Sequence, residues 1–166
     1  DYHHDVSQDP YQMNASVLDR VSGKYGVLDI INSGSAMELD TKSIEHIEDI
    51  VRERKIHTLW FEAHYMYRHR LSEFAQMFSP AEVKFRCGVE TFDGRLRKSW
   101  NKGINEDVTA KEVARYFQGV CLLCCVEGQT KAQIMDDLAK AEEYFEYYSV
   151  NLFCNNTTPM RRDHAL

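Results

Sequence analysis

Five hydrophobic runs of this sequence each end in polar residues that could do chemistry. The polar groups are Asn32-Ser33-Gly34-Ser35, Glu62-Ala63-His64, Glu90-Thr91-Phe92-Asp93, Glu127-Gly128-Gln129 and Asn155-Asn156-Thr157. Glutamate and histidine act as general acids and bases, and histidine does so near neutral pH. Loops are polar in general, so one such group alone says little. Five in order along the chain, three of them with a glutamate, predict a ligand site.

The first of these groups has the composition of a loop that approaches a ligand closely. Gly34 lets the backbone come near a bound molecule, while Asn32, Ser33 and Ser35 offer hydrogen-bond donors and acceptors before an electropositive helix start. Such a loop suits a zwitterion. A plain strand-to-helix turn uses the same residue types, so this alternative stays open.

The elements that must position these groups follow a repeating pattern. From residue 25 onward, short apolar runs alternate with stretches of helical period, which indicates βα units around a parallel sheet. We expect strands at 25–31, 56–61, 82–89, 119–126 and 148–154. We expect helices at 41–54, 69–78 and 95–102, a short helix that starts at Thr109, and a last helix from about Thr130 to Tyr147. Thr109 with Glu112 and Thr130 with Gln133 form predicted capping boxes. In such a sheet all five polar groups fall at one edge, where ligands bind.

The predicted fold class is α/β, a partial TIM-type (βα)6 barrel with parallel strands over residues 25–166, with exposed sheet edges. Residues 1–24 show no period and are expected to form a loop or linker. Their His3, His4 and Asp5 are adjacent residues on a flexible end, so we expect no metal site there.

Composition restricts the classes of function. The 166 residues carry a formal charge of -6, which disfavours binding to an extended nucleic acid and favours a small-molecule substrate, although tRNA stays open. No apolar run reaches membrane-spanning length and no leader peptide is evident, so we expect a cytoplasmic protein without a membrane partner. The odd number of cysteines, 5, predicts reduced thiols rather than disulfides.

Four segments in order resemble radical S-adenosylmethionine (SAM) enzymes, especially their archaeosine-type and elongator-type branches. "INSGSAMELD" (31–40) resembles the Ser-Gly-Ser form of their second-strand motif, and "LWFEAHYMYR" (59–68) resembles their third-strand Glu-Ser/Thr-Arg-Pro segment, from which Ala63 and His64 depart. "CGVETFDGRLRKSWNKGI" (87–104) is similar to their fourth strand and the Lys-Gly after it, and "VCLLCCVEGQT" (120–130) to their fifth strand and its exit. The resemblance covers residues 25 to about 158 and implies the second to sixth strands of the family's barrel.

The resemblance implies a role for each matching residue. Asn32, Ser33, Gly34 and Ser35 would hold the amino group of SAM; Glu90 and Thr91 would lie near its ribose or methionine portion; Val126, Glu127, Gly128 and Asn155 would flank its adenine. Glu62 and His64 would face the reaction space as catalytic residues, although a structural role for His64 is equally consistent with its sequence context. The family reaction is cleavage of SAM to a 5′-deoxyadenosyl radical that abstracts a hydrogen atom. The implied substrate is a small deazaguanine base or nucleoside, as in queuine or queuosine salvage, and the implied electron donor is a flavodoxin or ferredoxin.

The family's [4Fe-4S] cluster needs a Cys-x3-Cys-x2-Cys motif, which this sequence lacks. Cys121, Cys124 and Cys125 lie within a predicted buried strand, where alternation places Cys124 on the face opposite the other two. We therefore expect core thiols and no metal ligands among them.

Two other classes of function remain open. One is a cluster-less binding or scaffold module with this fold. The other is a TIM-type lyase or aldolase that uses Glu62, Glu90 and Glu127 as acids and bases. An aldolase of this kind commonly needs a Schiff-base lysine, and Lys84, the only lysine expected near a strand end, lies at the wrong end of its strand.

Overall fold

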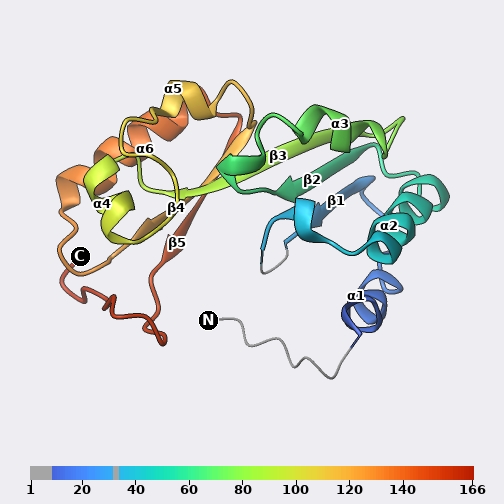
Figure 1. The fold of residues 1–166 in the computed structure, drawn as a ribbon, viewed down its shortest axis with the longest axis horizontal. Coiled ribbons are helices and arrows are strands. Elements are labelled where there is room, and N and C mark those ends of the chain that lie inside the picture. The colour runs from blue at the N-terminus through green and yellow to red at the C-terminus, as the bar shows by residue number, and fades with distance from the viewer. Residues whose placement is uncertain (1–8, 32–33) are drawn as a thin grey trace.

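The protein folds around one curled parallel sheet, seen in a computed structural model that describes residues 9–31 and 34–166. The strands are β1 (Val27–Ile30), β2 (Thr58–Glu62), β3 (Glu82–Glu90), β4 (Gly119–Cys124) and β5 (Tyr147–Leu152). They pair in the order β1-β2-β3-β4-β5, all parallel, and form a half-barrel (Figure 1). Sequence order equals spatial order because each helical connection returns the chain beside the strand it has just left. The predicted partial TIM-type α/β fold is confirmed.

The helices lie between the strands, as the periodicity predicts. They are α2 (Thr41–Glu53), α3 (Leu71–Gln76), α4 (Gly94–Ser99), α5 (Ala110–Val113) and α6 (Lys131–Tyr144), with short 3-10 turns η1 (Ala36–Glu38) and η2 (Tyr65–Tyr67). Both predicted capping boxes form, with Thr109 and Thr130 as the N-caps. The capping residues thus place the starts of α5 and α6 correctly from sequence.

Residues 1–24 are expected to form a loop, but Pro10–Leu18 form the helix α1, so the prediction is wrong there. Asp9 caps this helix by accepting a hydrogen bond from the Tyr11 N–H at 3.1 Å. The helix packs on α2, where Asn14 Nδ2 donates to Ser43 Oγ at 2.8 Å. Leu18 is its one buried residue, so the helix has no apolar stripe that a periodicity search would detect. Residues 1–8, with His3, His4 and Asp5, lie outside the described residues.

The two faces of the sheet differ in chemistry. The face toward the helices is apolar: Leu59, Phe61, Phe85, Cys87, Val89, Val120 and Leu122 are buried there against residues such as Ile47, Phe74, Phe78 and Val113. The ring of Phe61, for example, lies 5.3 Å from that of Phe74 in α3. Because side chains alternate along a strand, Asp29, Glu62, Arg86 and Gly88 belong to the opposite face, which we call the inner face. The core therefore holds the sheet while the inner face stays polar.

A close backbone contact joins α4 to the loop before α5. A Cβ atom added at Gly94 would lie 2.1 Å from the Glu106 carbonyl oxygen and 2.8 Å from its carbon. Since both atoms belong to the backbone, the clash cannot be relieved by a side-chain rotation. We expect Gly94→Ala to lower the free energy of unfolding by about 2 kcal/mol, measured by urea denaturation. Gly88→Ala is the comparison, because Gly88 has no positive φ and an added Cβ there meets only the side-chain oxygens of Glu62 at 3.3 Å and Glu90 at 3.8 Å, which can rotate away; equal losses in both variants would contradict a backbone clash at Gly94.

The chain after β5 folds back onto the exit of β4. Val126 pairs antiparallel with Arg162, and the Glu127 N–H donates to the Arg161 carbonyl at 2.8 Å. Among the described residues, β1 and β5 each have a strand on one side only, and Val27, Val150 and Leu152 are exposed there. The expected open edges are present in this part of the chain. None of the helices in the described segments is both long and apolar enough to cross a membrane.

Candidate active site

The inner face has an aromatic floor near the start of the strands. The rings of Trp60 in β2 and Tyr147 in β5 lie 5.6 Å apart, although β3 and β4 separate their strands. They meet above Gly119 of β4, where an added Cβ would lie 3.2 Å from the Trp60 ring. The missing side chain at Gly119 and the curl of the sheet let the rings approach. The polar residues of the inner face lie between this floor and the strand ends.

A buried arginine, Arg86, contacts two carboxylates on the inner face beside this aromatic pair. Arg86 Nη1 donates to Asp29 Oδ2 at 2.9 Å, a second contact joins Nη2 to Asp29 Oδ1, and Arg86 Nε lies 3.9 Å from Glu62 Oε2. The Arg86 side chain is 4% exposed, against 40% for Asp29 and 30% for Glu62. Burial alone would lower the pKa of Arg86, but the hydrogen bonds and charge of Asp29 outweigh it and the pKa is raised. The fixed guanidinium therefore orients both carboxylates.

Glu62 and Glu90 flank the bare backbone of Gly88. A Cβ added at Gly88 would lie 3.3 Å from Glu62 Oε1 and 3.8 Å from Glu90 Oε1. Burial raises the pKa of Glu62; Arg86 opposes this shift and Glu90 adds to it. Glu90 also accepts a hydrogen bond from Lys102 Nζ at 2.8 Å. Two carboxylates with different partners thus face one space, an arrangement that can accept hydrogen bonds from a cationic or N–H-rich ligand.

His64 is fully engaged by backbone groups. Its Nδ1 accepts from the Met66 N–H at 3.2 Å, which places the proton on Nε2, and Nε2 donates to the Lys102 carbonyl at 2.8 Å. In this arrangement His64 caps η2 and ties the exit of β2 to the segment after α4. The structural role that the sequence left open is present, and a catalytic role for His64 stays a prediction.

Of the predicted SAM loop, Asn32 and Ser33 lie outside the described residues. Gly34 is exposed, whereas Ser35 is buried and its Oγ accepts from the Met37 N–H at 3.4 Å and the His64 N–H at 3.3 Å. Ser35 also forms a capping box with Glu38 at the start of η1. Its side chain joins the exits of β1 and β2, while Gly34 is the accessible part of this loop.

Of the other residues predicted to contact SAM at the exits of β3, β4 and β5, some are buried and some are exposed. The side chains of Thr91 and Val126 are almost completely buried, so only their backbone could reach a ligand. Glu127, Gly128 and Asn155 are exposed at the ends of β4 and β5, and Asn155 Oδ1 accepts from the Arg162 N–H at 2.8 Å. We therefore assign Thr91 and Val126 to the support of the strand exits rather than to side-chain contact with SAM.

The thiols among the described residues do not fit an iron–sulfur cluster. Cys87, Cys121, Cys124 and Cys125 are buried and Cys154 is exposed; all are free, and no group of three metal-ligating side chains occurs in the described part of the chain. Burial raises the pKa of Cys121 and of Cys124 to about 11, which disfavours thiolate ligands. The prediction that Cys124 and Cys125 lie on opposite faces is wrong. Cys125 follows the strand with a φ of 63°, and this turns its Sγ to within 3.9 Å of the Cys124 Sγ.

This thiol arrangement predicts selective alkylation. We expect iodoacetamide at pH 8 to modify Cys154 rapidly in the native protein and the four buried thiols only after denaturation, because accessible thiolate is the reacting form. Mass spectrometry of tryptic peptides over time measures this. Cys154→Ser should remove the fast phase, and fast labelling that persists in this variant would contradict the described burial.

Sequence reasoning missed three residues of the site. Asp29 is the one charged residue of β1, and Arg86 lies at the centre of β3; strand alternation places both on the inner face, and this is the signal that could have found them. The expectation that no lysine approaches the carboxyl ends of the strands is wrong. Lys102 reaches Glu90 there, although twelve positions separate them, while Lys84 pairs with Glu146 at 2.6 Å near the floor. Contact between Lys102 and Glu90 depends on the path of the chain after α4, which no local pattern encodes.

Comparison with solved structures identifies the family. A structure described as queuine lyase from Clostridium spiroforme bound to SAM and queuine matches with a TM-score of 0.88 and 38% sequence identity, over 94% of this chain and 67% of that chain. The chain belongs to the radical SAM enzymes. No family model and no curated protein matches it. Membership in the radical SAM enzymes confirms the resemblance inferred from the four segments, and it disfavours the aldolase alternative.

Proposed function

We propose that this chain forms the SAM- and substrate-binding part of a radical SAM lyase that acts on queuine or a closely related deazaguanine. The observation that carries the proposal is the match, at 38% identity over 94% of this chain, to a lyase bound to both molecules. The acidic inner face supports it. A deazaguanine presents a row of N–H donors, and the side chain of queuine adds an amine that is protonated at neutral pH.

Glu62 is the residue that we assign to the substrate. Arg86 fixes its carboxylate, and Gly88 leaves space in front of it. A carboxylate can accept two parallel N–H donors from a guanine-like edge, or one from an ammonium group. Burial raises the pKa of Glu62, so this carboxyl can exchange a proton at a higher pH than an ordinary glutamate does.

SAM would lie across the strand ends beside this position. Gly34 at the exit of β1, Glu127 and Gly128 at the exit of β4, and Asn155 after β5 are exposed there. The Glu90 carboxylate, between them at the exit of β3, suits a hydroxyl or an ammonium group of SAM. These assignments keep the predicted cofactor set, with Thr91, Val126 and Ser35 in supporting positions.

In this family a [4Fe-4S] cluster and SAM together supply a 5′-deoxyadenosyl radical that abstracts a hydrogen atom from the substrate. The residues at 9–31 and 34–166 do not fit the cluster, so we assign no step of the reaction to a cluster ligand in this part of the chain. A flavodoxin or ferredoxin as electron donor and the cytoplasm as location complete the proposal. The five free thiols fit such a reducing compartment.

The test is anaerobic turnover of the iron-loaded, full-length protein with SAM, dithionite and one substrate at a time. We expect 5′-deoxyadenosine and a deazaguanine product with queuine, less with the nucleoside queuosine, and none with intact queuosine-containing tRNA, all detected by liquid chromatography and mass spectrometry. Activity on tRNA alone would defeat the small-substrate proposal.

The absence of cluster ligands from the described residues favours one second candidate, a binding module without catalysis. Calorimetric titration with SAM and with queuine separates the two candidates. Binding of both ligands with no iron retained after loading and no 5′-deoxyadenosine formed would support the module. Binding together with turnover would support the lyase.

A further inference from the structure

The exit of β3 carries a site residue in an unfavourable backbone conformation. Glu90 has a φ of 65°, in the left-handed region that residues other than glycine rarely adopt, and the register of β3 with β4 shifts between Cys87 and Glu90. Such a conformation persists only where surrounding contacts hold it. The contacts on the residues that follow Glu90 therefore decide whether its carboxylate faces the site.

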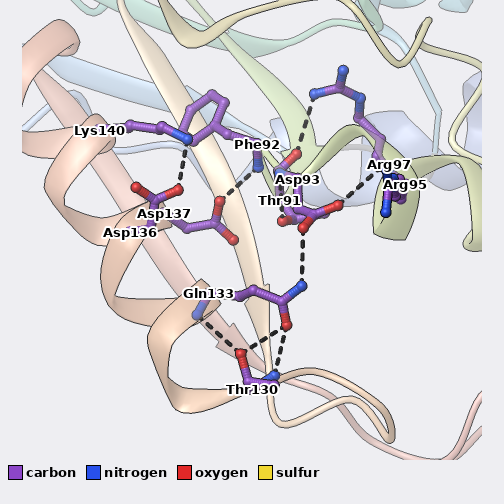
Figure 2. A network of polar contacts seen from close by, with 10 residues as sticks. All are labelled: Thr91, Phe92, Asp93, Arg95, Arg97, Thr130, Gln133, Asp136, Asp137 and Lys140. Atoms are coloured by element: carbon purple, nitrogen blue, oxygen red, sulfur yellow. Dashed lines mark hydrogen bonds and ion pairs between the residues drawn. The ribbon is translucent and has the colours of Figure 1, made fainter.

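A buried carboxyl on α6 contacts these residues from one side. Asp137 is 3% exposed, and its Oδ1 accepts from the Phe92 N–H at 2.7 Å (Figure 2). Burial raises the pKa of Asp137, and the Thr91 side chain and the Phe92 N–H oppose this shift. Asp137 is too deep to touch a ligand, yet it holds the two residues directly after Glu90.

A buried guanidinium on α4 holds the same turn from the other side. Arg97 Nη1 donates to the Thr91 carbonyl at 3.3 Å. Next in the chain, Asp93 caps α4 through the Arg95 and Leu96 N–H groups and accepts from Gln133 Nε2 of α6 at 2.9 Å. Figure 2 shows these contacts meeting at Thr91, Phe92 and Asp93. The turn is thus fixed to both α4 and α6.

We propose that Asp137 is a positioning residue of the active site, which acts through Thr91 and Phe92 to hold Glu90 in its left-handed conformation facing the ligand. The inference rests on the proposed function, because SAM or its co-substrate is the ligand concerned. Asp137 Oδ2 has no hydrogen-bond partner within the described segments, so Oδ1 is the oxygen that accepts the hydrogen bond from the Phe92 N–H. Asparagine keeps that acceptor with the same shape, whereas leucine removes it.

Three variants of the full-length protein test this role. Asp137→Leu should raise the Kd for SAM about tenfold or more, because a displaced contact group loses most of its binding interaction. Asp137→Asn should stay within about twofold of wild type. Asp136→Asn is the matched control: this neighbouring carboxylate is exposed and pairs with Lys140 at 2.6 Å. Calorimetry is done at a temperature where circular dichroism shows every variant folded. An unchanged Kd in Asp137→Leu would overturn the proposal.

A double-mutant cycle with Glu90→Ala separates positioning from a general loss of stability. If Asp137 acts through Glu90, Asp137→Leu should have little further effect on the Kd once Glu90 is alanine. Multiplicative effects of the two substitutions would show independent action and overturn the proposal.

Amide hydrogen exchange gives a second readout that needs no ligand. Exchange of the Phe92 amide should become faster in Asp137→Leu but not in Asp136→Asn. Wild-type protein that binds no SAM would defeat the proposed function, and the positioning role would then be judged on exchange alone. Equal exchange in the two variants would overturn it.

Discussion

Replacing Arg97 with methionine is expected to lower the free energy of unfolding by about 4 kcal/mol, the largest loss of stability that we predict for a single side chain. Arg97 is 0% exposed, and its guanidinium donates to four backbone carbonyls. Its partners are the carbonyl oxygens of Thr91 at 3.3 Å, Asn105 at 2.6 Å, Glu106 at 3.4 Å and Val108 at 2.9 Å. Methionine fills much of the volume but leaves these acceptors without a donor.

The loss reflects unpaired carbonyls rather than a missing ion pair. Burial lowers the pKa of Arg97, yet a guanidinium stays protonated at neutral pH and keeps its donors. Urea denaturation measures the effect. Arg95→Met, at an exposed position of the same helix, is the matched control and should change stability by less than about 0.5 kcal/mol. Similar losses in the two variants would mean that the carbonyl contacts contribute little.

Replacing Glu62 with glutamine is expected to reduce turnover about 100-fold or more while leaving the protein at least as stable as wild type at pH 7. Glutamine has nearly the same shape but carries no charge and cannot exchange a proton. If Glu62 binds an N–H-rich or cationic substrate, the amide presents donors where an acceptor is needed. Product formation under anaerobic conditions gives kcat and KM, and calorimetry gives the Kd for queuine.

The stability part of this prediction follows from the pKa of Glu62. Burial raises it above 4.5, so the folded state binds this proton more tightly than the unfolded chain does. That stabilisation is complete below the unfolded pKa and is lost as the pH rises through the folded pKa. The melting temperature of wild type relative to Glu62→Gln should therefore fall as the pH rises from about 4.5 through the raised pKa of the folded state.

The matched control for Glu62 is Glu82→Gln, on the exposed start of β3, which should leave both turnover and the pH dependence unchanged. A Glu62→Gln enzyme with wild-type kcat and KM would remove Glu62 from the site. A variant that is less stable than wild type at pH 7 would show that attraction to Arg86 outweighs burial.

Local features of this protein are encoded by short stretches of sequence, whereas contacts between distant residues are not. The sequence predicts the strand positions, the capping residues Thr109 and Thr130, and the polar ends of the strands, because each of these features depends on residues that are neighbours in the chain. The helix α1 could not, because its position depends on docking to α2 through Asn14 and Ser43. Cys125 was misplaced since strand alternation stops where its φ becomes positive.

The sequence alone determined that this protein is a parallel α/β half-barrel of radical SAM type with its polar groups at one edge. Periodicity and short ordered motifs encode this locally. Which polar groups meet depends on the tertiary structure: Asp29 meets Arg86, Lys102 meets Glu90, and Asp137 meets the turn after Glu90. These contacts join residues from 12 to 57 positions apart. They depend on the register and curl of the whole sheet, which no short segment specifies.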